Sequence, residues 1–280
     1  MVDGLSINTN SSANIALNQL QILNKKLEAT QLRITTGLKV SGPKDDAATF
    51  QIATRLRGDV AGLGAVKTAL ANGDSIVSVA ISAGESITDL LTESKAKVVQ
   101  ANQTGLDTAS RSALDNDFQQ LRSQIETIVS TADFNAVNLI DANASTLDVL
   151  SSVDGSVISV SAQSLDTTTL GINTASLATS SAAANALSAI ETAIDLAADK
   201  LAALGASATG IEIQSQFTTS LINVVEEGVG NLVDADLAEE SAKLQALQVQ
   251  QQLSVQSLAI ANSAPSLVLN LFPIPGGSSG

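Results

Sequence analysis

The stretch LGAVKTALANGDSIVSVAISAGESITDLLTESKAKV, residues 63–98, decides the fold class of this chain. Small and aliphatic residues recur in it at alternating intervals of three and four, and no proline interrupts them. The members of this stripe are Leu63, Val66, Leu70, Gly73, Val77, Ala80, Gly84, Ile87, Leu91, Ser94 and Val98. A strict seven-residue repeat is typical of helices that wind around one another. The stripe therefore predicts a long α-helix with one face packed against partner helices.

The expected length of this helix constrains what it packs against. If it begins near Asp45 and ends near Asn102–Gly105, it measures about 80 Å at ~1.5 Å per residue. A compact globule cannot bury a stripe of that length. The partner helices must be similarly long, from this chain or from copies of it. The alternative is an ordinary core helix of a bundle.

The terminal segments predict two further long helices. One expected helix covers residues 13–34, stops at Gly37 and the Ser41-Gly42-Pro43 cluster, and is followed by Asp45 and Asp46 as caps of the long helix. The other runs from Leu237 to Asn262, is apolar on several sides and is expected to end at Pro265. The residues expected to pack within and between chains are Ala13, Ala16, Leu20, Leu23, Leu27, Ile34, Leu244, Leu247, Val249, Leu253, Leu258 and Ile260.

The middle of the chain predicts a helical return, a small β insert and another helix. Asp107 or Ser110 would cap the return helix, which carries the stripe Leu114, Phe118, Leu121, Ile125 and Ile128. The β-prone runs 146–150 and 157–162, with a turn at Asp154-Gly155, are the only β-like region expected. Helical spacing resumes at Leu187 and continues toward Leu232, although Gly205 and Gly210 weaken the prediction of an unbroken helix. The fold class is all-α, with long antiparallel coiled-coil helices from both termini and a small β-hairpin insert.

Charge and composition exclude several classes of function. Residues 1–122 carry 12 basic and 12 acidic residues, whereas residues 123–280 carry 2 basic and 16 acidic, a net charge of −14. Without a basic stripe to displace counterions from phosphate, nucleic-acid binding is not expected. Residues 1–18 have no leader pattern, and no apolar run of about 18 residues predicts a transmembrane helix.

No catalytic or metal-binding constellation is predicted, and no cofactor is expected. His and Cys are absent, which removes thiol nucleophiles and the usual zinc ligands. The carboxylate clusters are better explained as helix caps and solvated faces than as acid/base or metal sites. They are Asp45-Asp46, Glu226-Glu227, Asp234-x-Asp236 and Glu239-Glu240. We therefore do not expect an enzyme.

Three motifs, in this order along the chain, resemble those of bacterial flagellin. LRITTGLKVSGPKDDAA at 32–48 is similar to the family's RLSTGLRINSAKDDAA stretch, and DFNAVNLID at 133–141 is similar to its TFNGxxLLDG. The C-terminal run, residues 234–272, is similar to the family's last helix. By this resemblance the chain is a short flagellin, with inner-core and outer-core domains alone.

The resemblance implies a division into domains and an altered receptor patch. Residues 1–44 and 236–272 would form an inner-core coiled coil, residues 45–235 an outer-core domain with its β insert near 141–180, and residues 273–280 a flexible tail. The outer-core stripe would include Leu63, Val66, Leu70, Val77, Ile87 and Leu91. The patch that an animal innate immune receptor binds in this family would be replaced here by Glu93, Ser94, Lys95 and Lys97. Lysine lacks the planar guanidinium of the family's arginine.

The function implied is that of a structural subunit that self-assembles into the bacterial flagellar filament for motility. Implied partners are copies of the chain, an export chaperone, and filament cap or junction proteins, without a membrane or nucleic acid. The implied location is the extracellular flagellum, reached by flagellar type III export without a cleaved signal peptide. Because isolated short helices are marginal, the ends are expected to become helical on assembly. The alternative function is a hook–filament junction protein or another coiled-coil interaction module of the export system.

Overall fold

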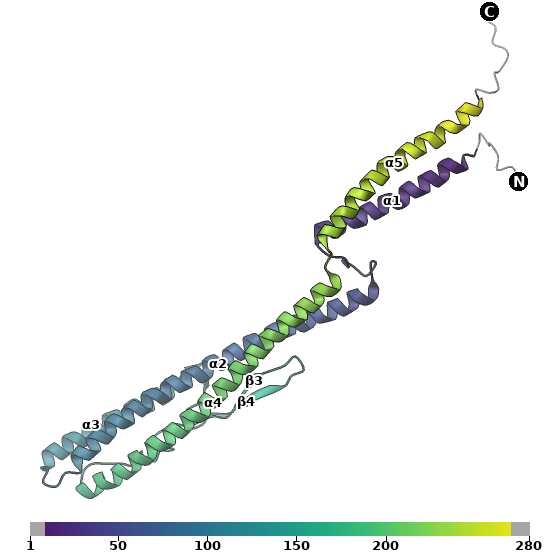
Figure 1. Cartoon of the computed structure of the whole chain (residues 1–280). Coiled ribbons are helices and arrows are strands. Elements are labelled where there is room, and N and C mark those ends of the chain that lie inside the picture. The colour runs from purple at the N-terminus through teal and green to yellow at the C-terminus, as the bar shows by residue number, and fades with distance from the viewer. Residues whose placement is uncertain (1–8, 270–280) are drawn as a thin grey trace, which may run out of the picture. The chain divides into compact units, whose positions relative to one another are not determined.

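The computed structural model describes the backbone of residues 9–269, with side chains described as far as Ser263. Five helices are described, namely α1 (Ser11–Thr36), α2 (Ala47–Ala101), α3 (Thr108–Thr131), α4 (Ser180–Val233) and α5 (Leu237–Leu269). Figure 1 shows α1 beside α5, and α2 beside α3 and α4. The predicted all-α class with a small β-hairpin insert is confirmed. The expected tail, residues 273–280, lies outside the described residues.

The chain forms two compact units. Unit 1 comprises Met1–Arg57 and Glu226–Gly280, and unit 2 comprises Gly58–Val225. These divisions fall within the continuous helices α2 and α4, whereas the divisions expected from the sequence, at 44/45 and 235/236, fall in the connections between helices.

Helix α1 is capped by Asn10 at its N-terminus and by Gly37 at its C-terminus. The Asn10 side chain accepts a hydrogen bond of 3.0 Å from the backbone N–H of Ala13, which satisfies one of the unpaired donors of the first turn. At the other end, Gly37 has a φ of 71° and its N–H donates to the Arg33 carbonyl. This left-handed conformation strains residues with a Cβ, so glycine is the residue that ends the helix most readily.

The two connections of unit 1 are hydrogen-bonded to each other. Lys39 N–H donates to the Val233 carbonyl at 2.7 Å, and Ala235 N–H donates to the Gly37 carbonyl at 2.9 Å. Asp46 caps α2 by accepting from the N–H groups of Ala48 and Thr49. Asp45 does not cap the helix as expected. It accepts instead from Ser41 and Gly42 N–H, and so holds the turn that precedes it.

The core of unit 2 is organised by the stripe on α2. All eleven stripe residues from Leu63 to Val98 are buried. The aliphatic members from Val66 to Val98 pack with residues such as Phe118 and Ile125 of α3 and Ile190 and Leu204 of α4. At 55 residues, α2 is long enough to bury one continuous face against both of these helices.

The β insert is an antiparallel hairpin of β3 (Leu147–Leu150) and β4 (Val157–Val160). Alternate side chains face opposite sides, so Val149 and Val160 are buried while Asp148 and Ser159 are paired on the outside by a hydrogen bond of 2.6 Å. Val149 packs directly on Gly73 of α2, where an added Cβ would lie 2.6 Å from its Cγ2.

Two local expectations are wrong, and the long helix expected from Leu187 toward Leu232, which two glycines weakened, is confirmed. A second small hairpin, β1 (Asp133–Phe134) with β2 (Val137–Asn138), lies outside the single β-like region that was expected. Asn135 and Ala136 turn it with positive φ values. Helix α4 passes through Gly205 without a break, because neighbouring packing outweighs a propensity loss of about 1 kcal/mol. Helix α5 continues past Pro265 to Leu269, since a proline removes a single donor and disfavours the turn before it without ending every helix.

Candidate functional site

The seam between α1 and α5 is built from a heptad stripe on each helix. On α1 the least exposed side chains are those of Ala13, Ala16, Leu20, Leu23, Leu27, Thr30 and Ile34. On α5 they are those of Glu240, Leu244, Leu247, Gln251, Ser254, Leu258 and Ala261. Leu23 keeps 8% of its surface exposed and Leu27 keeps 7%, but most of the others are half-buried. Two helices alone therefore leave this seam incompletely covered.

Three polar contacts across the seam determine how α1 and α5 align. Arg33 donates to Glu240 Oε1 at 3.3 Å, Gln251 Nε2 donates to Asn24 Oδ1 at 2.8 Å, and Asn10 Nδ2 donates to the Ala261 carbonyl at 2.7 Å. Going along α1 toward its N-terminus, the partners advance along α5 toward its C-terminus. The two helices are therefore antiparallel. Polar contacts at seam positions also hold them in one register, because a shifted alignment would break these contacts.

Glu240 is a buried carboxylate in this seam. The residue is 5% exposed, and Oε1 accepts from both Arg33 and Lys243. The other oxygen, Oε2, is buried without a hydrogen-bond partner within the described residues. The sequence analysis placed Glu239 and Glu240 among caps and solvated faces. Asp236 is the cap of α5, Glu239 is exposed and pairs with Lys243, and Glu240 lies inside.

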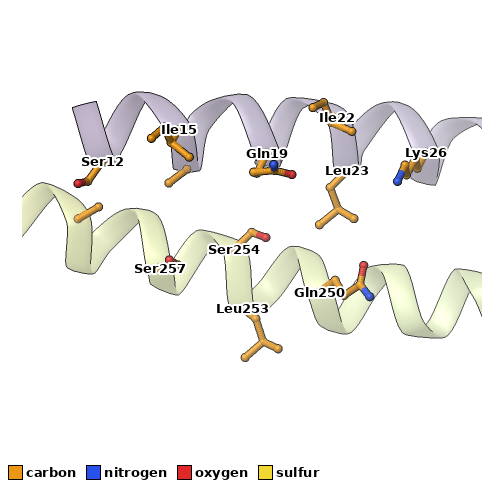
Figure 2. Close-up of a pocket in the computed structure, with 12 residues that line it drawn as sticks. Ser12, Ile15, Gln19, Ile22, Leu23, Lys26, Gln250, Leu253, Ser254 and Ser257 are labelled. Atoms are coloured by element: carbon orange, nitrogen blue, oxygen red, sulfur yellow. The ribbon is translucent and has the colours of Figure 1, made fainter. Parts of the chain in front are cut away.

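The predicted packing residues of α5 divide into two groups. Leu244, Leu247 and Leu258 lie in the seam with α1. Val249, Leu253 and Ile260 face away from it and are 55%, 57% and 71% exposed. Figure 2 shows Leu23 pointing from α1 toward α5, while Leu253 points away from α1.

Helix α1 has exposed apolar side chains as well, namely Ile15, Leu17, Ile22 and Leu32. A groove of about 580 Å³ runs between the helices and is lined by residues of both, including Ile15, Ile22, Leu253 and Ser257 (Figure 2). A second groove of about 410 Å³ shares Lys26 and Gln250 with the first and is lined also by Arg33 and Lys243. A helix pair with apolar side chains inside and outside has the composition of a surface that other chains cover.

The residues expected from the resemblance to form the outer-core stripe and the altered receptor patch all lie on α2. Leu63, Val66, Leu70, Val77, Ile87 and Leu91 are buried in unit 2. Ser94, the eighth-to-last residue of α2, is 1% exposed and belongs to the same buried face. Glu93 is exposed, Lys95 pairs with Glu191 at 3.0 Å, and Lys97 pairs with Asp117 at 2.8 Å. The hydrogen bond to Asp117 raises the pKa of Lys97.

A row of polar residues on α3 holds the serine- and threonine-rich connection to α4. Asp115 accepts from Leu177 N–H, Gln119 donates to the Ala175 carbonyl, Arg122 donates to the Asn173 carbonyl, and Glu126 accepts from Thr167 N–H. The spacing of four, three and four residues puts these side chains on one face of the helix. Sequence analysis missed this row because it searched for apolar stripes, although the same spacing was present in the polar residues.

Neither a metal site nor a membrane-spanning helix is found among the residues that the structure describes. Across residues 9–263, no group of three Asp or Glu side chains is placed to hold a metal ion. Across the described helices, none is both long enough and apolar enough to cross a membrane.

Comparison with known proteins yields two family models and several relatives. The model of the bacterial flagellin N-terminal helical region matches residues 7–145, and that of the C-terminal helical region matches residues 187–272. Flagellin FljK of Caulobacter vibrioides is 44% identical over 268 residues, covering 95% of this chain and 98% of the relative. A flagellin of Brucella melitensis is 39% identical, covering 95% and 99%.

A solved structure assigned to the flagellar hook-associated proteins of Vibrio parahaemolyticus resembles this chain with a TM-score of 0.57. The similarity covers 68% of this chain and 100% of that structure at 13% identity. At this identity the likeness describes the fold alone.

Proposed function

This chain belongs to the bacterial flagellin family and is a structural subunit of the flagellar filament, and from that premise we propose that copies polymerise through its α1–α5 helix pair. One observation carries this proposal. The helix pair keeps large apolar side chains such as Leu253 and Ile260 on the side away from its own seam. Their burial in water-excluding contacts is worth about 25 cal/mol per Å² of apolar surface, and a neighbouring subunit is what would supply those contacts in a polymer.

In this proposal the residues expected from the sequence have two different roles. Leu23, Leu27, Leu244, Leu247 and Leu258 hold α1 and α5 together within one subunit. Val249, Leu253 and Ile260 contact neighbouring subunits. Residues 1–44 and 236–272 are then the inner core of the filament, and residues 45–235 are the outer core.

The same proposal extends to how the chain leaves the cell and to the proteins that assist it. We propose export by the flagellar type III route with the N-terminus intact, assisted by an export chaperone and followed by incorporation beneath a filament cap. Mass spectrometry of protein collected outside the cell should find residues 2–18 present. Loss of some 20 residues, about the length of a cleaved leader, would instead indicate a secretory signal peptide.

We also propose that the surface at residues 93–97 is a weak target for the immune receptor that the family resemblance implies. Ser94 faces the core, and the ammonium groups of Lys95 and Lys97 are engaged by carboxylates. Receptor-reporter cells should respond less to this monomer than to a flagellin whose patch carries the family's arginine. An equal response would refute this proposal.

Self-assembly is tested with the full chain at neutral pH and moderate salt. Electron microscopy should find filaments, and circular dichroism should find more helix in the polymer than in the monomer, because terminal helices gain partners on assembly. A chain that stays monomeric at every concentration would contradict the proposal. The hook–filament junction alternative is supported by a likeness of fold alone, whereas flagellin relatives match in sequence along nearly the whole chain.

A further inference from the structure

The two segments that make up unit 1 carry opposite net charges. Residues 9–57 hold seven cationic and three anionic side chains, a net charge of +4. Residues 226–269 hold one cationic and six anionic side chains, a net charge of −5. Within the described residues, a single ion pair, Arg33 with Glu240, joins the two segments. Most of this opposite charge is therefore not neutralised by contacts inside one subunit.

The start of α2 and the end of α4 present matched pairs of side chains. On α2, Ile52 is 52% exposed and is followed three residues later by the exposed Arg55. On α4, Val224 is 64% exposed and is followed three residues later by the exposed Glu227. Residues three apart lie on the same face of a helix, so each surface combines one branched aliphatic side chain with one charge.

Both surfaces face away from the packed side of their own helix. Arg55 comes two residues after the buried Ala53, and Glu227 comes two residues before the buried Val229, which is roughly 200° around a helix in each case. In the part of the chain that the structure describes, Arg55 and Glu227 form no ion pair, and neither do their neighbours Arg57 and Glu226. These charges are thus available to another molecule.

We propose that the Ile52–Arg55 surface of one subunit docks on the Val224–Glu227 surface of a second copy. The proposal rests on the self-assembly proposed above and names one of its contacts. Aliphatic side chains meet at the centre, and a cation meets a carboxylate beside them. Because the two surfaces are different, a subunit that offers one still has the other free. Such a head-to-tail contact continues without closing and extends a helical polymer.

Complementary charge also gives this contact a characteristic dependence on salt. Arg57 and Glu226 add to the opposite potentials of the two surfaces. Electrostatic complementarity between partners accelerates association and is screened by ions. Raising sodium chloride from about 0.05 M to about 0.5 M should therefore slow elongation of the wild-type polymer, since the Debye length falls from about 14 Å to about 4 Å.

The decisive experiment reverses each charge and then mixes the variants. Arg55→Glu and Glu227→Arg should each raise the critical concentration for polymerisation about tenfold at low salt, because like charges then meet at every contact. A mixture of the two variants in equal amounts should polymerise, since each reversed surface then has a partner of opposite sign. The double variant Arg55→Glu/Glu227→Arg should polymerise alone. Lys200→Glu and Asp195→Arg change the net charge equally and serve as controls.

The readouts are sedimentation of polymer against total protein and circular dichroism of each monomer. If Arg55→Glu polymerises like the wild type, or if folded single variants stay soluble when mixed and in the double variant, the docking contact is wrong. Self-assembly would stand in both cases, because the wild type would still polymerise. Failure of the wild type itself would refute the proposed function instead.

Discussion

Leu253 and Leu23 differ in the structure in a way that separates contacts between subunits from contacts within one. Leu253 is 57% exposed and points away from α1, whereas Leu23 is 8% exposed in the seam (Figure 2). Burying a whole leucine side chain contributes about 1.5–3 kcal/mol, so covering the exposed part of Leu253 contributes about 1–1.5 kcal/mol. We expect Leu253→Ala to leave the monomer unchanged and to raise the critical concentration about five- to tenfold, at about 1.4 kcal/mol per factor of ten.

Leu23→Ala removes contacts that exist already in the subunit. Truncating a leucine in a packed core costs about 2–5 kcal/mol, and in a half-covered two-helix seam we expect the lower end, about 2 kcal/mol. This variant should lose helical circular dichroism as a monomer and should also polymerise poorly. In both variants the α2–α3–α4 core of unit 2 should melt as in the wild type.

The control is Val157→Ala on β4, where the side chain is 49% exposed on the hairpin of unit 2. It should leave assembly nearly unchanged, because the hairpin belongs to residues 45–235, the proposed outer core, and not to the α1–α5 pair that is proposed to polymerise. Sedimentation of polymer against total protein measures all three variants, with thermal melts of the monomers alongside. If Leu253→Ala polymerises like the wild type while Val157→Ala does not, the assignment of inner and outer surfaces is reversed.

Three other predictions concern the fold of the subunit. Gly73→Ala should lower the free energy of unfolding by about 1–2 kcal/mol, because the added Cβ meets the stiff, β-branched side chain of Val149. Gly64→Ala should raise the free energy of unfolding by about 0.5–1 kcal/mol, because its Cβ meets nothing within 4 Å and alanine favours the helix. Chemical denaturation of the two variants measures both effects, and equal effects would refute the close packing at Gly73. Arg111→Ala should lower the free energy of unfolding by about 2 kcal/mol, since the buried guanidinium donates to the carbonyls of Ala101 and Gln103 where α2 ends. Arg111→Lys should restore less than half of that loss, because an ammonium cannot reproduce the planar set of donors, and chemical denaturation measures both variants. Hydrogen bonds from Thr49 lower the pKa of Asp46 below its ordinary 3.8. The Asp46 carboxylate therefore stabilises the fold above pH 3.8, and this stabilisation is lost as the pH falls through the lowered pKa. In Asp46→Asn the loss of helicity on acid titration should be shallower below pH 3.8, and a curve identical to that of the wild type would contradict this prediction.

The heptad stripe of α2 could be predicted because nothing in residues 63–98 competes with it. The spacing stays in one phase for eleven positions, and all of them are buried. The turn between β3 and β4 could also be predicted, since Asp154-Gly155 is a dipeptide typical of hairpin turns, and Gly155 has a φ of 87° in the structure. The hairpin at 133–138 was not, because its positive φ values fall on Asn135 and Ala136, and an alanine gives no signal for that conformation.

The seam of α5 could not be chosen from the sequence, for a related reason. Apolar residues occupy more than one heptad phase on this helix, and each phase predicts a different face. The phase that packs on α1 includes Glu240, Gln251 and Ser254, whereas a search for apolar stripes favours Val249, Leu253 and Ile260. The burial pattern of α5 and the contacts of Arg33 and Asn24 across the seam identify the correct phase in the structure.

This choice of phase has a consequence for how stable the α1–α5 pair can be by itself. Of the seven seam positions on α5 up to Ser263, as far as side chains are described, three are polar, and a polar residue at such a position specifies register at a cost in stability. Glu240 adds a buried oxygen that has no hydrogen-bond partner among the described residues, which lowers the stability of the pair further. Val249, Leu253 and Ile260 are instead on the outside, where a neighbouring copy would cover them. Most of the free energy that orders these two helices must then come from neighbours, so the folding of the pair depends on the concentration of the subunit.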